Sequence, residues 1–165
     1  MEGLLIIGAG QFGIMVREIA SETGNFSKID FLDDTSEAAV GRISDMGRLI
    51  SEYGYAICAI GNPQVRGRIT EELVRAGYKI ATVVSPRAYV SPSAALGEGV
   101  IIEPMAVVQK CAVIGRGSIV SSGAVARHDC RVGQMCHLDC NCVVSSLSSV
   151  PDCTKVECLT LFKNN

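Results

Sequence analysis

The 165-residue chain has no tryptophan, 5% aromatic residues and only 19% charged residues. Because 48% of its residues are hydrophobic, an intrinsically disordered chain is excluded. The scarcity of aromatic side chains favours an interior built from compact aliphatic ones. A net charge of −2 at pH 7 provides no broad basic surface for phosphates, so nucleic acid is not an expected partner.

Targeting signals are also missing. The N-terminal segment MEGLLIIGAGQFG has no basic stretch and places glycines where a signal peptide is apolar. No apolar run approaches the length that spans a membrane. These features predict a cytoplasmic protein with no membrane partner. Eight cysteines in such a chain predict free thiols in a reducing compartment.

The first half alternates between short apolar runs and helical patterns. Strands are expected over residues 4–8, 29–32, 55–60 and 80–84, with helices over about 12–22, 46–53 and 64–76. Gly24 and Gly77 are expected to be helix C-caps. This order predicts a small Rossmann-like α/β domain over residues 1–85, in which helices cover the faces of a parallel sheet.

A different rhythm begins at Val90, where every sixth residue is large and apolar. Twelve of thirteen positions fit: Val90, Leu96, Ile102, Val108, Ile114, Val120, Val132, Leu138, Val144, Val150, Val156 and Phe162, with Ala126 the exception. Chance would give about four. A compact residue follows four positions after each, and glycines at 97, 99, 115, 117, 123 and 133 suit turns. Neither a helix nor an ordinary strand sustains this period, which predicts a hexapeptide-repeat parallel β-helix over residues 86–165.

The cysteines of the second half first suggest a metal site, since Cys136, His137, Cys140 and Cys142 lie close together. Zinc requires ligands that converge tetrahedrally, usually from two separated pairs. Cys130, Cys136 and Cys142 are instead spaced by six, as the repeat requires. We therefore expect no metal. The cysteines are assigned to interior packing or to stacking between neighbouring coils, as for Cys140 and Cys158, with an acyl-accepting cysteine as a lesser alternative.

The glycine-rich turn GAGQFG follows the first strand and contains Gly8, Gly10 and Gly13. Backbone N–H groups there can approach an anion at the start of a helix. Asp33 and Asp34 lie about twenty residues further on, where a carboxylate could bind ribose hydroxyls. The pattern also fits NAD, but a dinucleotide needs two binding halves and 85 residues supply one. A nucleotide-linked sugar is favoured, NAD is an alternative, and a tight turn without a ligand is another.

Gly61 and Asn62 follow the third strand, at the edge where open α/β sheets bind ligands. Arg66 lies one helical turn later, where it could contact a phosphate or Asp34. A surface salt bridge is the alternative for Arg66.

His128 is the leading candidate for chemistry in the second half. A neutral imidazole is well suited to remove a proton from an attacking amine or hydroxyl, because its pKa lies near working pH. Asp129 could orient the ring, but only if the chain bends between these neighbours. A solvent-exposed histidine without function is the alternative.

The chain resembles the sialic-acid O-acetyltransferase and UDP-amino-sugar N-acetyltransferase family of hexapeptide-repeat sugar acyltransferases. The resemblance covers nearly the whole length and rests on GAGQFG at 8–13, FLDD at 31–34, AIGNPQVR at 59–66, SPSA at 91–94 and RHDCRVGQMCHL at 127–138. Gln11-Phe12-Gly13 stands where the family usually has Gly-His-Gly.

The resemblance implies a left-handed β-helix that binds acetyl-CoA, and a homotrimer with sites between neighbouring prisms. It implies that Gly61 and Asn62 approach the uridine or sugar, that His128 is the catalytic base, and that His137 lies near the donor thioester. Longer members continue through further coils that contribute acyl-CoA contacts, whereas this sequence ends at Asn165 after about four 18-residue coils.

Together these features predict an enzyme that moves an acetyl group from acetyl-CoA to an amino or hydroxyl group of a nucleotide-activated sugar, with His128 as general base. The first alternative is a nucleotide-sugar-binding module that has lost the CoA site. The second is an NAD-linked oxidoreductase or sensor.

Overall fold

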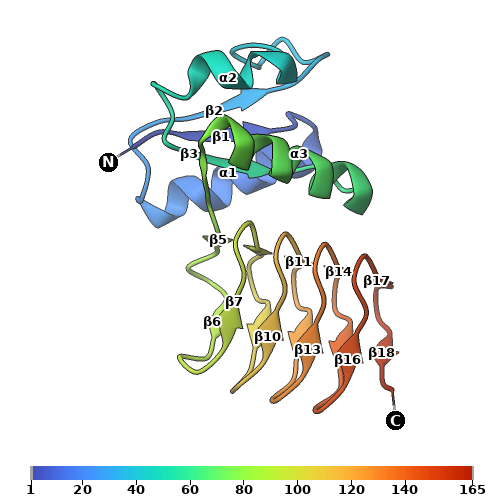
Figure 1. The fold of residues 1–165 in the computed structure, drawn as a ribbon. Helices are drawn as coiled ribbons and strands as arrows, with labels where there is room; N and C mark the ends of the chain where they lie inside the picture. The colour runs from blue at the N-terminus through green and yellow to red at the C-terminus, as the bar shows by residue number, and fades with distance from the viewer. Residues whose placement is uncertain (1, 165) are drawn as a thin grey trace. The chain divides into compact units, whose positions relative to one another are not determined.

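The computed structural model describes residues 2–164 and divides into two compact units, the first ending at Ala81 and the second beginning at Thr82 (Figure 1). Each unit has its own hydrophobic core. Within residues 2–164, no helix combines the length and the apolar character that crossing a membrane requires.

The first unit is a four-stranded parallel sheet with the order β2-β1-β3-β4. The elements are β1 (Leu4–Ile7), α1 (Gln11–Thr23), β2 (Ile29–Leu32), η1 (Ile43–Asp45), α2 (Met46–Leu49), β3 (Tyr55–Cys58), α3 (Pro63–Ala76) and β4 (Lys79–Ile80). The central strand β1 pairs with β2 and β3, and all four of its side chains are buried. The predicted Rossmann-like sheet is confirmed, as are the C-caps Gly24 and Gly77.

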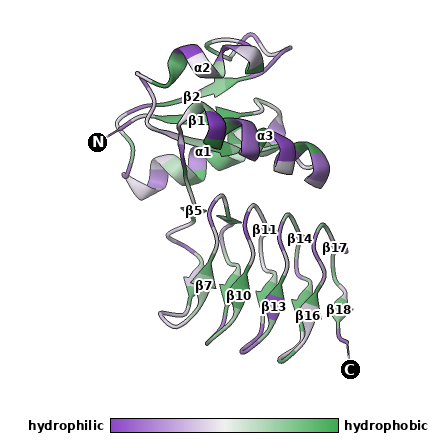
Figure 2. Cartoon of the chain, in the orientation of Figure 1, coloured by the Kyte–Doolittle hydropathy of each residue, from purple (hydrophilic) through white to green (hydrophobic). Residues whose placement is uncertain are grey.

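Both sides of β1 are covered, which explains its unbroken apolar sequence. Leu5 and Ile7 share a buried cluster with Ile69 and Leu73 of α3. Figure 2 shows hydrophobic residues along the strands and hydrophilic residues along the outer side of α3. The helix expected over residues 46–53 is shorter than predicted: α2 follows η1 directly and ends at Leu49.

The second unit is a left-handed parallel β-helix whose coils are stacked in Figure 1. Its strands have two residues each: β5 (Val83–Val84), β6 (Tyr89–Val90), β7 (Ala95–Leu96), β8 (Ile101–Ile102), β9 (Val107–Val108), β10 (Val113–Ile114), β11 (Ile119–Val120), β12 (Val125–Ala126), β13 (Arg131–Val132), β14 (His137–Leu138), β15 (Val143–Val144), β16 (Ser149–Val150), β17 (Lys155–Val156) and β18 (Leu161–Phe162). They form three parallel sheets, β7-β10-β13-β16, β5-β8-β11-β14-β17 and β6-β9-β12-β15-β18.

The predicted six-residue period is confirmed by pairing and burial. Val120 pairs with Ile102 and with Leu138, so successive coils are offset by 18 residues. The large residues and the compact Cys130, Cys136 and Cys142 form one buried core. Removing these thiols from water raises their pKa, to about 11 for Cys130 and Cys142. Interior packing is therefore confirmed for these three cysteines, whereas it is wrong for Cys111, Cys153 and Cys158, which are exposed.

One strand prediction is wrong in extent. Residues 80–84 were expected to form a single strand of the first sheet, but β4 ends at Ile80 and β5 pairs with β8 of the β-helix. Ala81 and Thr82 separate the two strands. Apolar character specifies burial at these positions and does not specify which sheet provides it.

The turns depend less on glycine than the sequence indicated. Among residues 2–164, eight non-glycine residues have φ between 54° and 64°, including Asp129 with φ 59°. Only Gly99, Gly117 and Gly123 of the six predicted turn glycines share this conformation. Gly115 serves another purpose, because a Cβ there would lie 2.5 Å from the carbonyl of Gly133 in the next coil. Close backbone approach thus explains the other glycines.

Candidate functional site

The glycine-rich turn joins β1 to α1 and brings the three predicted glycines together. Gly8 has φ 104°, and a Cβ on Gly13 would overlap the carbonyl oxygen of Gly8. Gly10 is the exposed N-cap residue of α1, without a side-chain cap and with open space where a Cβ would be. The turn therefore leaves the start of a 13-residue helix open to an anion.

Asp33 follows β2 and is held by the chain itself. Its Oδ2 accepts a hydrogen bond from Ala9 N at 2.8 Å, while its Oδ1 accepts bonds from Thr35 N, Thr35 Oγ1 and Ser36 N. These donors, Ala9 N–H foremost, lower the pKa of Asp33 to about 2. The carboxylate has about four acceptor positions, and the protein's own donors occupy them. Asp33 therefore connects the glycine-rich turn to the loop after β2. A ribose contact by Asp33 stays a prediction.

Asp34 lies on the edge of a different feature, a hollow of about 490 Å³. Its Oδ1 accepts a hydrogen bond from Ile43 N at 3.0 Å. The hollow is also lined by Arg42 and by Arg68 of α3. Sequence reasoning missed both arginines, because only the folded loop brings residue 42 next to a helix that begins at residue 63.

Gly61 and Asn62 lie exposed after β3. Asn62 is the N-cap of α3, and its Oδ1 accepts a hydrogen bond from Val65 N at 3.0 Å. Arg66 is only 1% exposed, and its Nη1 donates to the carbonyl oxygens of Ile60 and Gly61 at 2.9 and 2.8 Å. The surface salt bridge considered for Arg66 is wrong, because the residue is buried. Arg66 instead fixes the loop that exposes Gly61 and Asn62.

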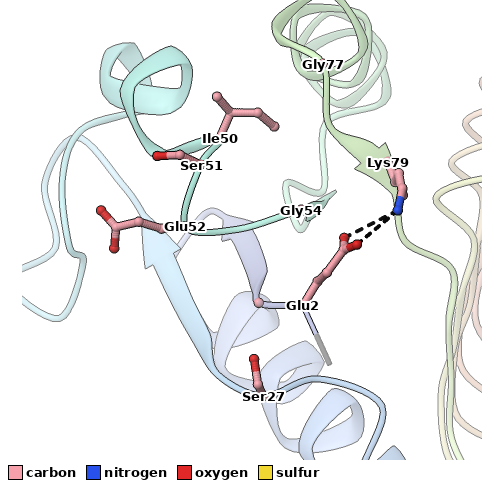
Figure 3. Close-up of a pocket in the computed structure, with 9 residues that line it drawn as sticks. Glu2, Ser27, Ile50, Ser51, Glu52, Gly54, Gly77 and Lys79 are labelled. Atoms are coloured by element: carbon pink, nitrogen blue, oxygen red, sulfur yellow. Dashed lines mark hydrogen bonds and ion pairs between the residues drawn. The ribbon is translucent and has the colours of Figure 1, made fainter.

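Another hollow of the first unit lies at the opposite edge of the sheet, where the strands begin. It has a volume of about 540 Å³ and is lined by residues that precede strands, including Glu2, Ser27 and Gly54. Figure 3 shows Lys79 paired with Glu2 across it, at 3.1 Å. None of the predicted site residues lines this hollow, and parallel α/β sheets bind ligands at the other edge.

His128 and Asp129 occupy the turn between β12 and β13. His128 Nδ1 lies 2.9 Å from Asp129 Oδ2. The left-handed conformation of Asp129 supplies the bend that this contact between neighbours needs. Hydrogen bonding to His128, with help from the charge of Lys110, lowers the pKa of Asp129.

This contact settles the proton position on neutral His128. An ionised carboxylate only accepts hydrogen bonds, so Nδ1 carries the proton and Nε2 keeps its lone pair. Among residues 2–164, no hydrogen bond from the protein occupies Nε2. The ring is oriented on one side and available as a base on the other.

A shallow hollow of about 470 Å³ adjoins His128 and is also lined by Tyr89, Gln109 and Lys110. Lys110 Nζ lies 3.8 Å from Asp129 Oδ2. Tyr89, Gln109 and Lys110 were not predicted as site residues. The 18-residue coil could have indicated Lys110, which is 18 positions before His128.

His137 lies elsewhere on the β-helix, on β14. Its Nε2 is 2.9 Å from Ser121 Oγ. It does not line the hollow at His128. His137 lies on a strand, whereas His128 lies in the turn between β12 and β13. A shared cleft between protomers stays a prediction. Among the described residues, no group of three or more His, Cys, Asp or Glu side chains is arranged to hold a metal ion.

Comparisons with known proteins agree with this architecture. The family described as "PglD N-terminal domain" matches residues 3–73. UDP-N-acetylbacillosamine N-acetyltransferase of Bacillus subtilis (strain 168) is 31% identical over 111 residues. That alignment covers 61% of this chain and 51% of the relative, so the chain spans about half the length of this curated relative.

Solved structures match over nearly the full chain. The acetyltransferase domain of PglB from Neisseria gonorrhoeae FA1090 has a TM-score of 0.80 at 26% identity, covering 96% of this chain and 92% of that one. The same domain in complex with acetyl coenzyme A has a TM-score of 0.66 at 26% identity, covering 93% of this chain and 95% of that one. Residues 3–73 thus match the PglD N-terminal domain family, and the two units and their order resemble those of the gonococcal acetyltransferase domain.

Proposed function

We propose that this protein transfers an acetyl group from acetyl-CoA to an amino or hydroxyl group of a nucleotide-linked sugar. The observation that carries the proposal is the oriented imidazole of His128. Its Nδ1 is held by Asp129 and its Nε2 has no protein partner among the described residues. The names of the Bacillus relative and of the gonococcal complex support both substrates.

His128 acts as the general base. As the acceptor nitrogen or oxygen attacks the thioester carbon, Nε2 takes the proton that the acceptor loses. The new bond to the carbonyl carbon forms, the carbon–sulfur bond breaks, and the proton returns to the departing CoA thiolate. Asp129 holds the ring and stabilises the imidazolium through the hydrogen bond at Nδ1.

The nucleotide end of the acceptor binds at the carboxyl edge of the first sheet. The open N-terminus of α1 suits a phosphate. The hollow presents two carboxylates, of Asp34 and Glu72, and the guanidinium groups of Arg42 and Arg68, of which Arg68 is paired with Glu72 at 2.8 Å. Asp33, Asn62 and Arg66 support this site by fixing its loops.

His137 binds near the donor thioester and donates a hydrogen bond to its carbonyl oxygen, assisted by a backbone N–H. The protein works as a homotrimer in the cytoplasm. Light scattering at micromolar concentration tests the trimer, and a monomer would contradict it.

The test of the function is release of the CoA thiol, measured with acetyl-CoA and a panel of nucleotide-linked amino and hydroxy sugars. We expect His128→Ala to lower the rate about 10²- to 10⁴-fold while calorimetry shows unchanged binding of acetyl-CoA. An unchanged rate removes His128 from the mechanism. Thermal stabilisation by NAD but not by acetyl-CoA overturns the acyltransferase, and stabilisation by the nucleotide-linked sugar alone indicates the binding module.

A further inference from the structure

The side chain of Gln109 reaches from one coil to the turn of the next. Its Oε1 accepts a hydrogen bond from the backbone N–H of His128 at 3.0 Å. In the same turn, Asp129 N donates to the carbonyl oxygen of Lys110 at 2.9 Å. The two bonds hold the turn that carries the imidazole.

The first of these bonds fixes which end of the Gln109 amide is which. A backbone N–H can only donate, so the atom that it meets must be the amide oxygen. The NH₂ group, with two donors, is consequently the other end. Among residues 2–164, no hydrogen bond occupies that group, and Gln109 lines the hollow beside His128.

The other walls of the hollow suit a carbohydrate ring. Tyr89 is 58% exposed and offers an aromatic surface, on which the C–H face of a sugar can pack. Lys110 and His128 provide polar groups at the edge. A neutral amide donor completes this set, because sugar hydroxyl and ring oxygens accept hydrogen bonds.

A second corner of the β-helix shows that a carboxylate can replace the amide oxygen. Glu103 Oε2 accepts a hydrogen bond from Ser122 N at 2.8 Å. Glu103 and Ser122 are 19 positions apart, as are Gln109 and His128. A glutamate at position 109 can therefore keep the bond to His128 N and remove only the NH₂ donors.

We propose that Gln109 is a specificity-determining residue for the acceptor: its amide NH₂ donates a hydrogen bond to an oxygen of the acceptor sugar while its Oε1 holds the His128 turn. This inference rests on the proposed acetyl transfer. It adds a sugar contact on the β-helix to the nucleotide contacts proposed for the first unit.

The test compares the full-length wild type with Gln109→Glu and Gln109→Met. Gln109→Glu keeps the acceptor for His128 N and loses the NH₂ donors, whereas Gln109→Met loses both. Loss of one such bond should raise the KM for the acceptor about 2- to 12-fold in both variants, with the KM for acetyl-CoA unchanged. A purely structural role predicts a wild-type acceptor KM for Gln109→Glu and a defect only in Gln109→Met, and that result overturns the proposal.

Two controls keep the outcome readable. Gln109→Glu places a carboxylate in the hollow that His128 and Lys110 also line, in addition to Asp129, which already contacts the ring. A charge effect would therefore shift the pH at which activity rises, and higher pH would restore the rate, whereas a lost donor persists at all pH values. Deoxy acceptors supply the second control. The analogue that lacks the contacted oxygen must have a higher KM than the normal acceptor with the wild type, but the same KM as the normal acceptor with Gln109→Glu.

If every deoxy analogue raises the acceptor KM of the wild type and of the variant by the same factor, the proposal is wrong. This comparison holds even if a variant is less stable than the wild type. Failure of the proposed function is distinguishable, because the wild type itself would then transfer no acetyl group.

Discussion

The two units of this protein treat their polar side chains differently. In the first unit, Asp33, Asn62 and Arg66 lie at the carboxyl edge of the sheet, where parallel α/β sheets bind ligands, yet each bonds to the protein's own backbone. In the second unit, His128 Nε2 and the Gln109 NH₂ group bond to no described residue. These three side chains of the first unit therefore hold its loops, while the β-helix turn leaves side-chain groups of His128 and Gln109 unbonded to the described protein.

The hydrophobic cores of the two units also differ in how the sequence specifies them. The sheet of the first unit depends on apolar runs and on single residues with special tasks, such as Gly13. The β-helix depends on one repeated rule, a large apolar residue at every sixth position. A turn in such a repeat can carry catalytic groups without disturbing the core, because its residues lie outside the buried column.

The largest effect on stability is expected in that column. Leu138 is fully buried, so Leu138→Ala should lower the free energy of unfolding by about 2–5 kcal/mol. Leu147 is 79% exposed on the same β-helix, and Leu147→Ala should change it by less than about 0.5 kcal/mol. Chemical denaturation followed by circular dichroism measures both. Equal effects would mean that the two leucines do not differ in burial.

Asp129 tests whether the polar groups of the second unit act in chemistry more than in folding. Asn tolerates the left-handed backbone of this position, so Asp129→Asn should leave the melting temperature unchanged. It replaces the carboxylate that fixes the proton on His128 Nδ1, and the transfer rate should fall by up to about 10⁴-fold, because the amide favours the wrong tautomer. A lower melting temperature with an unchanged rate would assign Asp129 to folding.

Gly13 tests the turn of the first unit. A Cβ at this position overlaps the carbonyl oxygen of Gly8, whereas a Cβ on Gly10 meets open space. Gly13→Ala should therefore cost about 1–3 kcal/mol of stability, and Gly10→Ala should be nearly neutral. Thermal unfolding of the two variants gives the comparison, and equal melting temperatures would contradict the close packing of the turn.

Asp33 gives the smallest effect and depends on pH. Its pKa is lowered from 3.8 to about 2, chiefly by Ala9 N–H, so its stabilisation is fully present above about pH 4 and is lost as pH falls towards 2. Asp33→Asn should cost about 1–2 kcal/mol at pH 7, and the difference from wild type should shrink near pH 2. Urea denaturation at both pH values measures it. A constant difference would show that the charge of Asp33 is not the stabilising feature.

The sequence was a good guide where a pattern repeats or a residue has one possible use. The six-residue period predicted the core of the β-helix, and Gly24 and Gly77 marked helix ends that the structure confirms. It was a poor guide where stacking decides. Nothing local distinguishes Ile80 from Val83, which belong to different sheets, and eight non-glycine residues adopt a backbone that glycine would indicate.

Part of the candidate site could also be read from the sequence. The structure brings His128 and Asp129 together as expected. Gln109 and Tyr89 escaped notice, because their position beside His128 depends on coils that lie one or two turns earlier. The burial of Arg66 was missed, because a charged residue on a helix normally faces solvent.

The central proposal is that this chain transfers an acetyl group to a nucleotide-linked sugar, with His128 as the general base. Mass spectrometry of a nucleotide-linked amino sugar, incubated with ¹³C-acetyl-CoA and the protein, tests it most directly. We expect one labelled acetyl group on the sugar with wild type and almost none with His128→Ala. CoA release that leaves the sugar unlabelled, or equal labelling by both proteins, would contradict the account.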